Sequence, residues 1–193
     1  MSAEYGGEQD APRLTPAVSE RDHSTGDPNA PVTLVEYGDY ECPHCGHAYP
    51  IVKSIQHRLG KKLRFVFRNF PLAESHPHAR HAAEAAEAAA AQGKFWQMHD
   101  TLFENQDRLE DDDIVEMAKR LKLDANAIDT ALAEGTYTSR VREDFRSGVR
   151  SGVNGTPTFF INGERYDGSW ADEDGFVRAL DRAAKAGAGA SHR

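Results

Sequence analysis

An apolar, β-branched run at residues 32–37 constrains the fold more than any other feature of the chain. Such a run is typical of a strand that is buried on both faces. Pro43 then opens a helical pattern that continues to about Arg58 and stops at Gly60, and residues 63–70 alternate as a second strand. Parallel strands need a crossover connection, so a strand, a helix and a strand in this order predict a parallel unit of a sheet.

A long helical block separates this unit from the remaining strands. No strand pattern occurs between Pro71 and about Ser151, and apolar residues at helical spacing predict helices over residues 78–91, 95–103, 111–121, 124–133 and 136–149. Residues 158–166 then predict an antiparallel hairpin around Asn162-Gly163, and residues 172–186 a last helix. We therefore expect an α/β protein in which residues 31–72 and 152–186 form one domain and residues 73–151 form an inserted helical domain.

Residues 1–30 differ in composition from the rest of the chain. They hold six acidic and two basic side chains, which accounts for half of the chain's net charge of −8, among many Gly, Pro and Ser residues. A segment of this composition buries too little apolar surface to offset the entropy of ordering it. It therefore predicts a flexible acidic tail.

The net charge and the hydropathy exclude several classes of protein. A charge of −8 disfavours binding to a phosphate backbone, so we expect no nucleic-acid partner. No apolar run approaches the roughly 18 residues of a membrane-spanning helix, so we expect no membrane span. The first ten residues lack the basic start and the apolar stretch of a secretory signal. We expect a cytoplasmic location for the chain as written, or an extracytoplasmic one for the product of a trimmed precursor.

The two cysteines, Cys42 and Cys45, stand three residues apart after the first strand, and two cysteines rule out a framework of structural disulfides. Pro43 suits the first helical position, which makes Cys42 the N-cap with its sulfur facing the N–H groups of His44 and Cys45. These groups and the helix dipole predict a pKa for Cys42 in the range of roughly 3.5 to 7.5. We expect Cys42 to be the attacking thiol and Cys45, one turn later, to be the resolving one.

Other uses of a paired cysteine motif fit the sequence less well. Covalent haem needs a histidine directly after the second cysteine, where Gly46 stands instead. A zinc site with His47 and another histidine lacks a second paired motif, and two inert buried cysteines would not need Pro43. We interpret the histidines at 76, 78 and 81 as surface polarity. We therefore predict no metal and no external cofactor, since the cysteine pair is itself the redox group.

Three segments carry a resemblance to a known family, namely Val35–Tyr37, Tyr40–Cys45 and Gly155–Gly163. Together they resemble the bacterial DsbA-like thiol-disulfide oxidoreductases of the thioredoxin superfamily, over about residues 27–186. The resemblance implies a thioredoxin-like fold with a helical domain inserted after the second strand of the core. It also implies that Pro157 is a cis-proline against the disulfide, and that Thr156 offers its backbone to an extended substrate.

Three charged or titratable residues lie near the cysteines in the sequence. Glu36 matches the position of a buried acid in this family and could exchange a proton with Cys45, whereas a glutamate at an exposed strand end would have no role. His44 is a possible cation beside the thiolate, or an exposed histidine without effect. Glu41 places a negative charge next to Cys42 where the family has an apolar residue, so the oxidising strength stays open.

Two classes of function follow from these residues. The first is a dithiol-disulfide oxidoreductase that forms a mixed disulfide at Cys42 and releases it through Cys45. Its partners would be protein thiols and disulfides, together with a redox recycling partner that the sequence does not identify. The alternative is a thioredoxin-like module that binds peptides or a metal without redox turnover.

Overall fold

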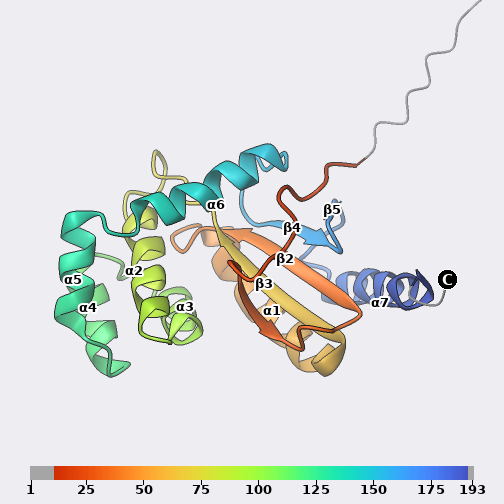
Figure 1. Cartoon of the computed structure of the whole chain (residues 1–193), viewed down its shortest axis with the longest axis horizontal. Coiled ribbons are helices and arrows are strands. Elements are labelled where there is room, and N and C mark those ends of the chain that lie inside the picture. The colour runs from red at the N-terminus through yellow and green to blue at the C-terminus, as the bar shows by residue number, and fades with distance from the viewer. Residues whose placement is uncertain (1–10, 191–193) are drawn as a thin grey trace, which may run out of the picture.

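The computed structural model describes residues 11–190, and a five-stranded sheet forms its centre (Figure 1). In chain order the strands are β1 (His23–Gly26), β2 (Val32–Gly38), β3 (Leu63–Asn69), β4 (Thr158–Ile161) and β5 (Glu164–Tyr166). Their order in the sheet is β1-β3-β2-β4-β5. The central strands β2 and β3 are parallel and the other pairs are antiparallel. Helix α1 (Pro43–Leu59) connects the two parallel strands, as predicted.

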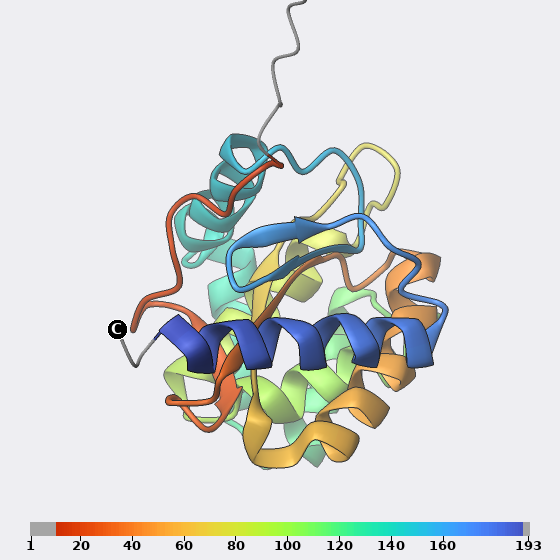
Figure 2. The same ribbon diagram turned by 90° about the vertical axis from the view of Figure 1, so that its right-hand side faces the viewer.

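Five helices lie between β3 and β4. They are α2 (Ala79–Ala91), α3 (Phe95–Glu104), α4 (Asp111–Arg120), α5 (Ala125–Glu134) and α6 (Thr138–Arg150). Figure 1 shows α2 to α5 beside the sheet, with α6 running from them back toward it. Helix α7 (Glu173–Ala190) closes the described chain and crosses the front of the molecule in Figure 2. The α/β fold class and the helical insertion after the second parallel strand are therefore confirmed.

The sheet buries a different cluster of apolar side chains on each face. Leu34, Phe65 and Phe67 belong to the larger cluster, together with residues of α1, α3 and α7. Val35 and Tyr37 belong to the smaller cluster on the other face, which residues before β1 and residues of α6 cover. Alternate residues of a strand point to opposite faces, so this division follows from the strand period. Apart from Thr33 and Glu36, the residues of β2 are accordingly apolar or glycine, as is typical of a strand covered on both sides.

The prediction of a flexible tail through residue 30 is wrong for residues 11–30. Leu14 is buried and its N–H donates to the carbonyl of Gly163 at 2.8 Å. Strand β1 then pairs with the outer edge of β3, with His23 opposite Phe67. The composition of this segment is polar, but its partners lie far away in the sequence and supply the contacts that order it. We call residues 11–22 the N-terminal strap, while residues 1–10 of the predicted tail lie outside the described residues.

Candidate active site

The two cysteines lie at the carboxyl end of β2, where α1 begins. Cys42 is the N-cap residue of α1 with an extended backbone, and Pro43 is the first helical residue, as predicted. Both sulfurs are thiols and both cysteines are buried. The Cys42 thiol donates to the carbonyl oxygen of Thr156 at 3.5 Å. The Thr156–Pro157 peptide bond is cis, so the fold brings together the motif and the distant loop that the resemblance singled out.

The two sulfurs have opposite protonation behaviour although they stand one helical turn apart. A hydrogen bond from the Cys45 thiol is the main cause that lowers the pKa of Cys42 to about 5, against the effect of burial. The side chain of Thr156 and the N–H groups of Cys45 and His44 lower it further. The Cys42 side chain makes no standard capping hydrogen bond, so the helix N–H groups contribute less than the sequence argument assumed. Burial raises the pKa of Cys45 well above its usual value.

Glu36 lies in β2, six residues before Cys42, and is 2% exposed. Its Oε1 atom has no hydrogen-bond partner among the described residues. Burial, with a smaller contribution from Cys42, raises the pKa of this carboxyl to about 8. A cavity of about 80 Å³ reaches Glu36 past Lys53 and Asp100. An exposed glutamate at a strand end is thereby excluded, and the charge of Glu36 acts on the pKa of Cys45.

The other two residues near the motif lie apart from the sulfurs. His44 is exposed, and its side chain makes no hydrogen bond or ion pair within residues 11–190. Glu41 is half-buried, and its Oε2 atom accepts a hydrogen bond at 2.7 Å from the N–H of His78, the N-cap residue of α2. The Glu41 carboxylate is therefore turned toward the helical insertion.

Residues from the helical insertion hold the whole loop from Asp39 to Cys42. The carboxylate of Asp39 accepts from the N–H of Leu72 and pairs with Nδ1 of His76, both at 2.8 Å. The amide of Gln106 donates to the carbonyls of Tyr40 and Cys42, at 2.8 and 2.9 Å. Sequence reasoning missed Asp39 and Gln106 because neither belongs to a recognisable motif. The only sequence feature that pointed to this region was the histidine cluster, which contains the Asp39 partner His76.

The three clustered histidines have separate roles. His76 pairs with Asp39, and the side chain of that aspartate is fully buried, so the interpretation of His76 as surface polarity is wrong. His81 forms an ion pair with Asp111 at 2.7 Å on the surface. Among the described residues, no group of three His, Cys, Asp or Glu side chains is placed to hold a metal ion.

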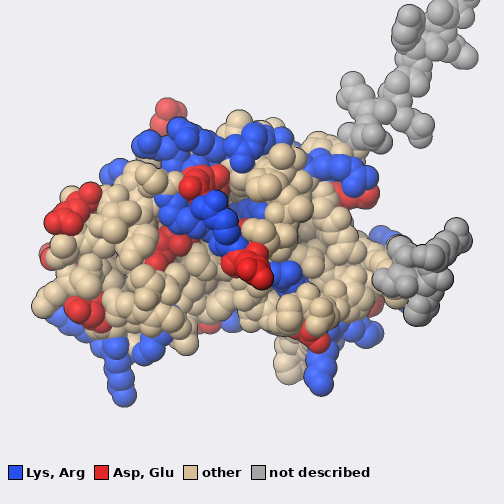
Figure 3. Space-filling model, in the orientation of Figure 1, with Lys and Arg blue, Asp and Glu red and all other residues tan. Residues whose placement is uncertain are grey.

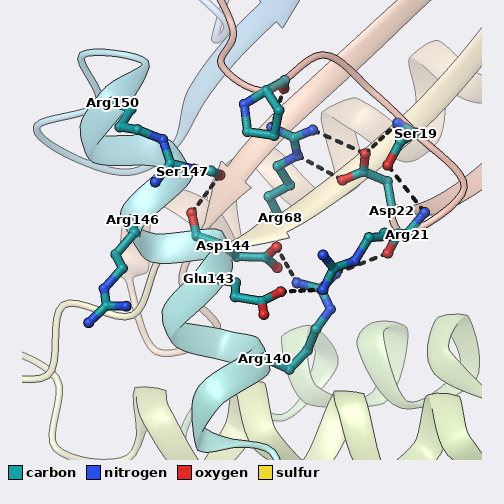
Figure 4. Close-up of a pocket in the computed structure, with 11 residues that line it drawn as sticks. Ser19, Arg21, Asp22, Arg68, Arg140, Glu143, Asp144, Arg146, Ser147 and Arg150 are labelled. Carbon is teal, nitrogen blue, oxygen red and sulfur yellow. Dashed lines mark hydrogen bonds and ion pairs between the residues drawn. The ribbon is translucent and has the colours of Figure 1, made fainter.

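A second polar cluster lies on the other face of the sheet, in a cleft of about 260 Å³ between the N-terminal strap and α6 (Figure 4). Arg68 on β3 forms a bidentate ion pair with Asp22 at 2.7 and 3.0 Å. It also donates to the hydroxyl of Tyr37 and to the carbonyl of Pro16. The outer wall is basic, and Figure 3 shows the Lys and Arg side chains gathered along the upper rim of the molecule over α6.

The fold and the paired cysteines define a thioredoxin-like protein with a helical insertion. A family model described as thioredoxin matches residues 18–182, and the chain belongs to this family. Among solved structures, oxidised BdbD from Bacillus subtilis is similar with a TM-score of 0.80 and 28% identity, covering 91% of this chain and 99% of that one. A thioredoxin-like oxidoreductase from Silicibacter pomeroyi DSS-3 has a TM-score of 0.76 and 26% identity, covering 86% and 94%.

The DsbA-like branch is also represented among the structural neighbours. Wolbachia pipientis α-DsbA1 has a TM-score of 0.74 and covers 88% of this chain and 94% of its own, although only 20% of the residues are identical. This likeness supports the fold, and the family match confirms the thioredoxin superfamily to which the sequence resemblance pointed.

The curated relatives in sequence are longer proteins. The Na⁺/H⁺ antiporter NhaA 1 of Mycobacterium sp. (strain KMS) is 44% identical over 170 residues, which is 87% of this chain and 28% of the antiporter. The antiporter NhaA 3 of Salinispora tropica is 45% identical over 157 residues, 81% of this chain and 24% of that protein. The chain thus spans about a quarter of the length of these relatives. Within residues 11–190, no helix is both long and apolar enough to cross a membrane.

Proposed function

We propose that this protein is a dithiol-disulfide oxidoreductase that exchanges disulfides with protein thiols through Cys42 and Cys45. The observation that carries the proposal is the place of Cys42, at the N-cap of α1 and against the cis Thr156–Pro157 peptide. There its pKa is lowered to about 5, whereas that of Cys45 is raised. Thiol-disulfide exchange needs a thiolate that attacks or leaves readily and a second thiol that resolves the mixed disulfide. The transport activity of the antiporters is not extended to this chain, which matches only a quarter of their length.

The exchange proceeds in two displacements. When the protein acts as oxidant, a substrate thiolate attacks the Cys42 sulfur of the Cys42–Cys45 disulfide, and the Cys45 sulfur leaves with the electron pair. A second substrate thiolate then attacks the substrate sulfur of the mixed disulfide, and Cys42 leaves as a thiolate. Two electrons thus pass from the substrate dithiol to the protein, and the reverse sequence reduces a substrate disulfide. Neither direction requires an external cofactor.

We assign the remaining site residues to positions around this exchange. The Glu36 carboxyl, with its pKa near 8, gives its proton to the departing Cys45 sulfur and takes it back before Cys45 attacks. Thr156 and Pro157 border the Cys42 sulfur and would align an extended substrate chain. Pro43 fixes the start of α1, and His44 is an exposed residue of the motif that an arriving substrate could contact. The redox partner that recycles the pair and the cellular location stay predictions.

A thiol titration and an exchange assay test the proposal. The thiolate absorbance of the reduced protein should show a first transition near pH 5, which Cys42→Ser removes. Cys45→Ala should raise this transition but leave it below the ordinary value of about 8.5, because the helix N–H groups and Thr156 remain. Wild-type protein should reduce insulin disulfides and Cys42→Ser should not. If Cys42→Ser retains full activity, the protein is instead a binding module whose cysteines are incidental.

Glu36→Gln gives an independent test of the assigned proton transfer. The amide keeps the shape of the carboxyl but exchanges no proton near pH 8, so resolution by Cys45 should slow about 10²-fold or more, in the range of general acid–base effects. The attack of Cys42 should remain, and mixed disulfides should accumulate in a quenched reaction. Equal resolution rates in the variant and the wild type would exclude Glu36 from this role.

A further inference from the structure

Every residue of the loop 39–42 is bound by the helical insertion, but only one of these contacts is an ion pair. We propose that His76 is a positioning residue of the dithiol site, whose imidazolium, paired with Asp39, fixes the loop that carries Cys42 and favours the Cys42 thiolate. The inference deepens the proposed function and rests on it. It assigns to the helical insertion a part in setting the redox chemistry of cysteines that lie outside it.

Asp39 connects His76 to the cysteine motif through its contacts. The side chain of Asp39 is fully buried, and its Oδ2 atom lies 2.8 Å from Nδ1 of His76. The carbonyl of the same residue accepts from the N–H of Cys42 at 3.2 Å, and the backbone of Asp39 partly offsets the rise in the pKa of Cys45. A displacement of Asp39 would therefore move the contacts of both sulfurs. His76, with only 19% of its side chain exposed, holds the Asp39 carboxyl in place.

The charges explain why a cation is needed at this place. The Asp39 side chain stands three residues before Cys42, and an unpaired negative charge there would oppose a thiolate. Burial opposes the charged form of His76, but Asp39, Cys42 and Glu41 together raise the pKa of this histidine. Coupling between two sites is reciprocal, so a thiolate that favours the imidazolium is itself favoured by it. His76 thereby cancels the charge of Asp39 next to the sulfur.

This assignment differs from the one that the sequence suggests. His44 stands inside the motif and would be the obvious cation, but its side chain is exposed and contacts no charged group of the described chain. His76 lies 34 positions after Cys42, in the loop that precedes α2. Water screens an exposed charge far more than a partly buried one, so the distant histidine is the better placed of the two.

A pair of matched variants tests the inference. His76→Gln removes the cation, and we expect the pKa of Cys42 to rise by about one unit. This corresponds to a tenfold change in the ionisation constant of the Cys42 thiol. The reduced form then loses stability, so glutathione should reduce the disulfide less readily by about the same factor. His76→Lys keeps a cation and should retain the low pKa. His81→Gln breaks a similar pair with Asp111 that does not contact the loop, and it should leave the Cys42 pKa unchanged.

A measurement on the unmodified protein covers the case in which a variant does not fold. The imidazole of His76, followed by NMR against pH, should have a higher pKa in the reduced protein than in the disulfide form, because only the reduced protein carries the Cys42 thiolate. Equal values in both forms, or a folded His76→Gln protein with an unchanged Cys42 pKa, would overturn the inference and leave the proposed function intact. A wild-type cysteine pair that does not exchange with glutathione would instead refute the proposed function.

Discussion

Glu36 and Tyr37 are neighbours in β2 that point to opposite faces of the sheet, and their polar atoms differ in hydrogen bonding. The Tyr37 hydroxyl lies 2.7 Å from Oγ of Ser147 and accepts from Arg68 at 2.9 Å. Oε1 of Glu36 has no partner in the described chain. Both residues are buried, so burial alone does not separate a structural polar group from a reactive one. The difference lies in whether the hydrogen bonds of the group are satisfied.

The Arg68 cluster shows how a fully satisfied site behaves. Burial of Asp22 opposes its charge, but hydrogen bonds from Arg68 and from the backbone of Ser19 lower its pKa overall. The carboxylate therefore stays ionised beside a guanidinium whose donors are used by Asp22, Tyr37 and backbone carbonyls. Every donor of Arg68 is therefore used within the protein, whereas Glu36 on the other face keeps a carboxyl oxygen without a partner in the described chain.

Removal of Arg68 should have the largest effect on the folded state. Arg68→Ala leaves the Asp22 carboxylate, with 6% of its side chain exposed, without its ion pair. We expect a loss of about 3–5 kcal/mol in the free energy of unfolding, measured with urea. Arg68→Lys should recover only part of it, because an ammonium does not reproduce the bidentate geometry. A loss below about 1 kcal/mol in Arg68→Ala would show that the two faces do not differ in this way.

Glu36→Gln should stabilise the protein, whereas Arg68→Ala destabilises it, and the size of this effect should depend on pH. The folded pKa of Glu36, near 8, lies above its ordinary value of 4.5, so the folded protein binds more protons than the unfolded chain between these values. Stability of the reduced wild type should therefore fall as pH rises through this window, by up to about 1.4 kcal/mol per pH unit from this group. The variant should lack this loss and become the more stable protein toward pH 8. Parallel stability curves for the two proteins would contradict the raised pKa.

Tyr37→Phe sharpens the comparison at the satisfied face. It removes one hydroxyl that bonds both Arg68 and Ser147, while the ring and its packing remain. We expect a loss of about 1–2 kcal/mol, since one buried partner is removed and the others stay. The exchange activity should not change, because the hydroxyl lies on the face away from the cysteines. A loss of exchange activity without a loss of stability would mean that the Tyr37 hydroxyl affects the cysteines on the other face of the sheet.

The ion pair of Arg21 and Glu143 at the rim of the same cleft should matter least. The two charged groups lie 2.6 Å apart, but 74% and 53% of their side chains are exposed. Exposed pairs are screened and contribute about 0.2–1 kcal/mol. Arg21→Ala should therefore lower stability by less than about 1 kcal/mol, and by less still at high salt. A loss of stability as large as that of Arg68→Ala would show that depth of burial does not determine how much these ion pairs contribute to stability.

The sequence predicted most of the elements because their signals are local. Each predicted helix and strand begins within two residues of its place in the structure, since proline, glycine and apolar spacing mark the starts. Strand β1 was missed because His23–Gly26 has neither apolar alternation nor β-branched enrichment, and its order comes from pairing with β3. In the site, the cysteines, Glu36 and Pro157 belong to motifs. Asp39 and Gln106 act through contacts with residues that are distant in the sequence, and local sequence patterns do not predict such contacts.

The position of β1 has a practical consequence for anyone who shortens this chain. Composition places the domain boundary near residue 30, but a cut there removes β1 and leaves the outer edge of β3 without a partner. An open edge with Phe65 and Phe67 alternating along it is a template on which a second chain can add a strand. A shortened protein would therefore tend to aggregate even with both cysteines and all of α1 in place. The inconspicuous polar segment before β2 protects the folded protein against self-association.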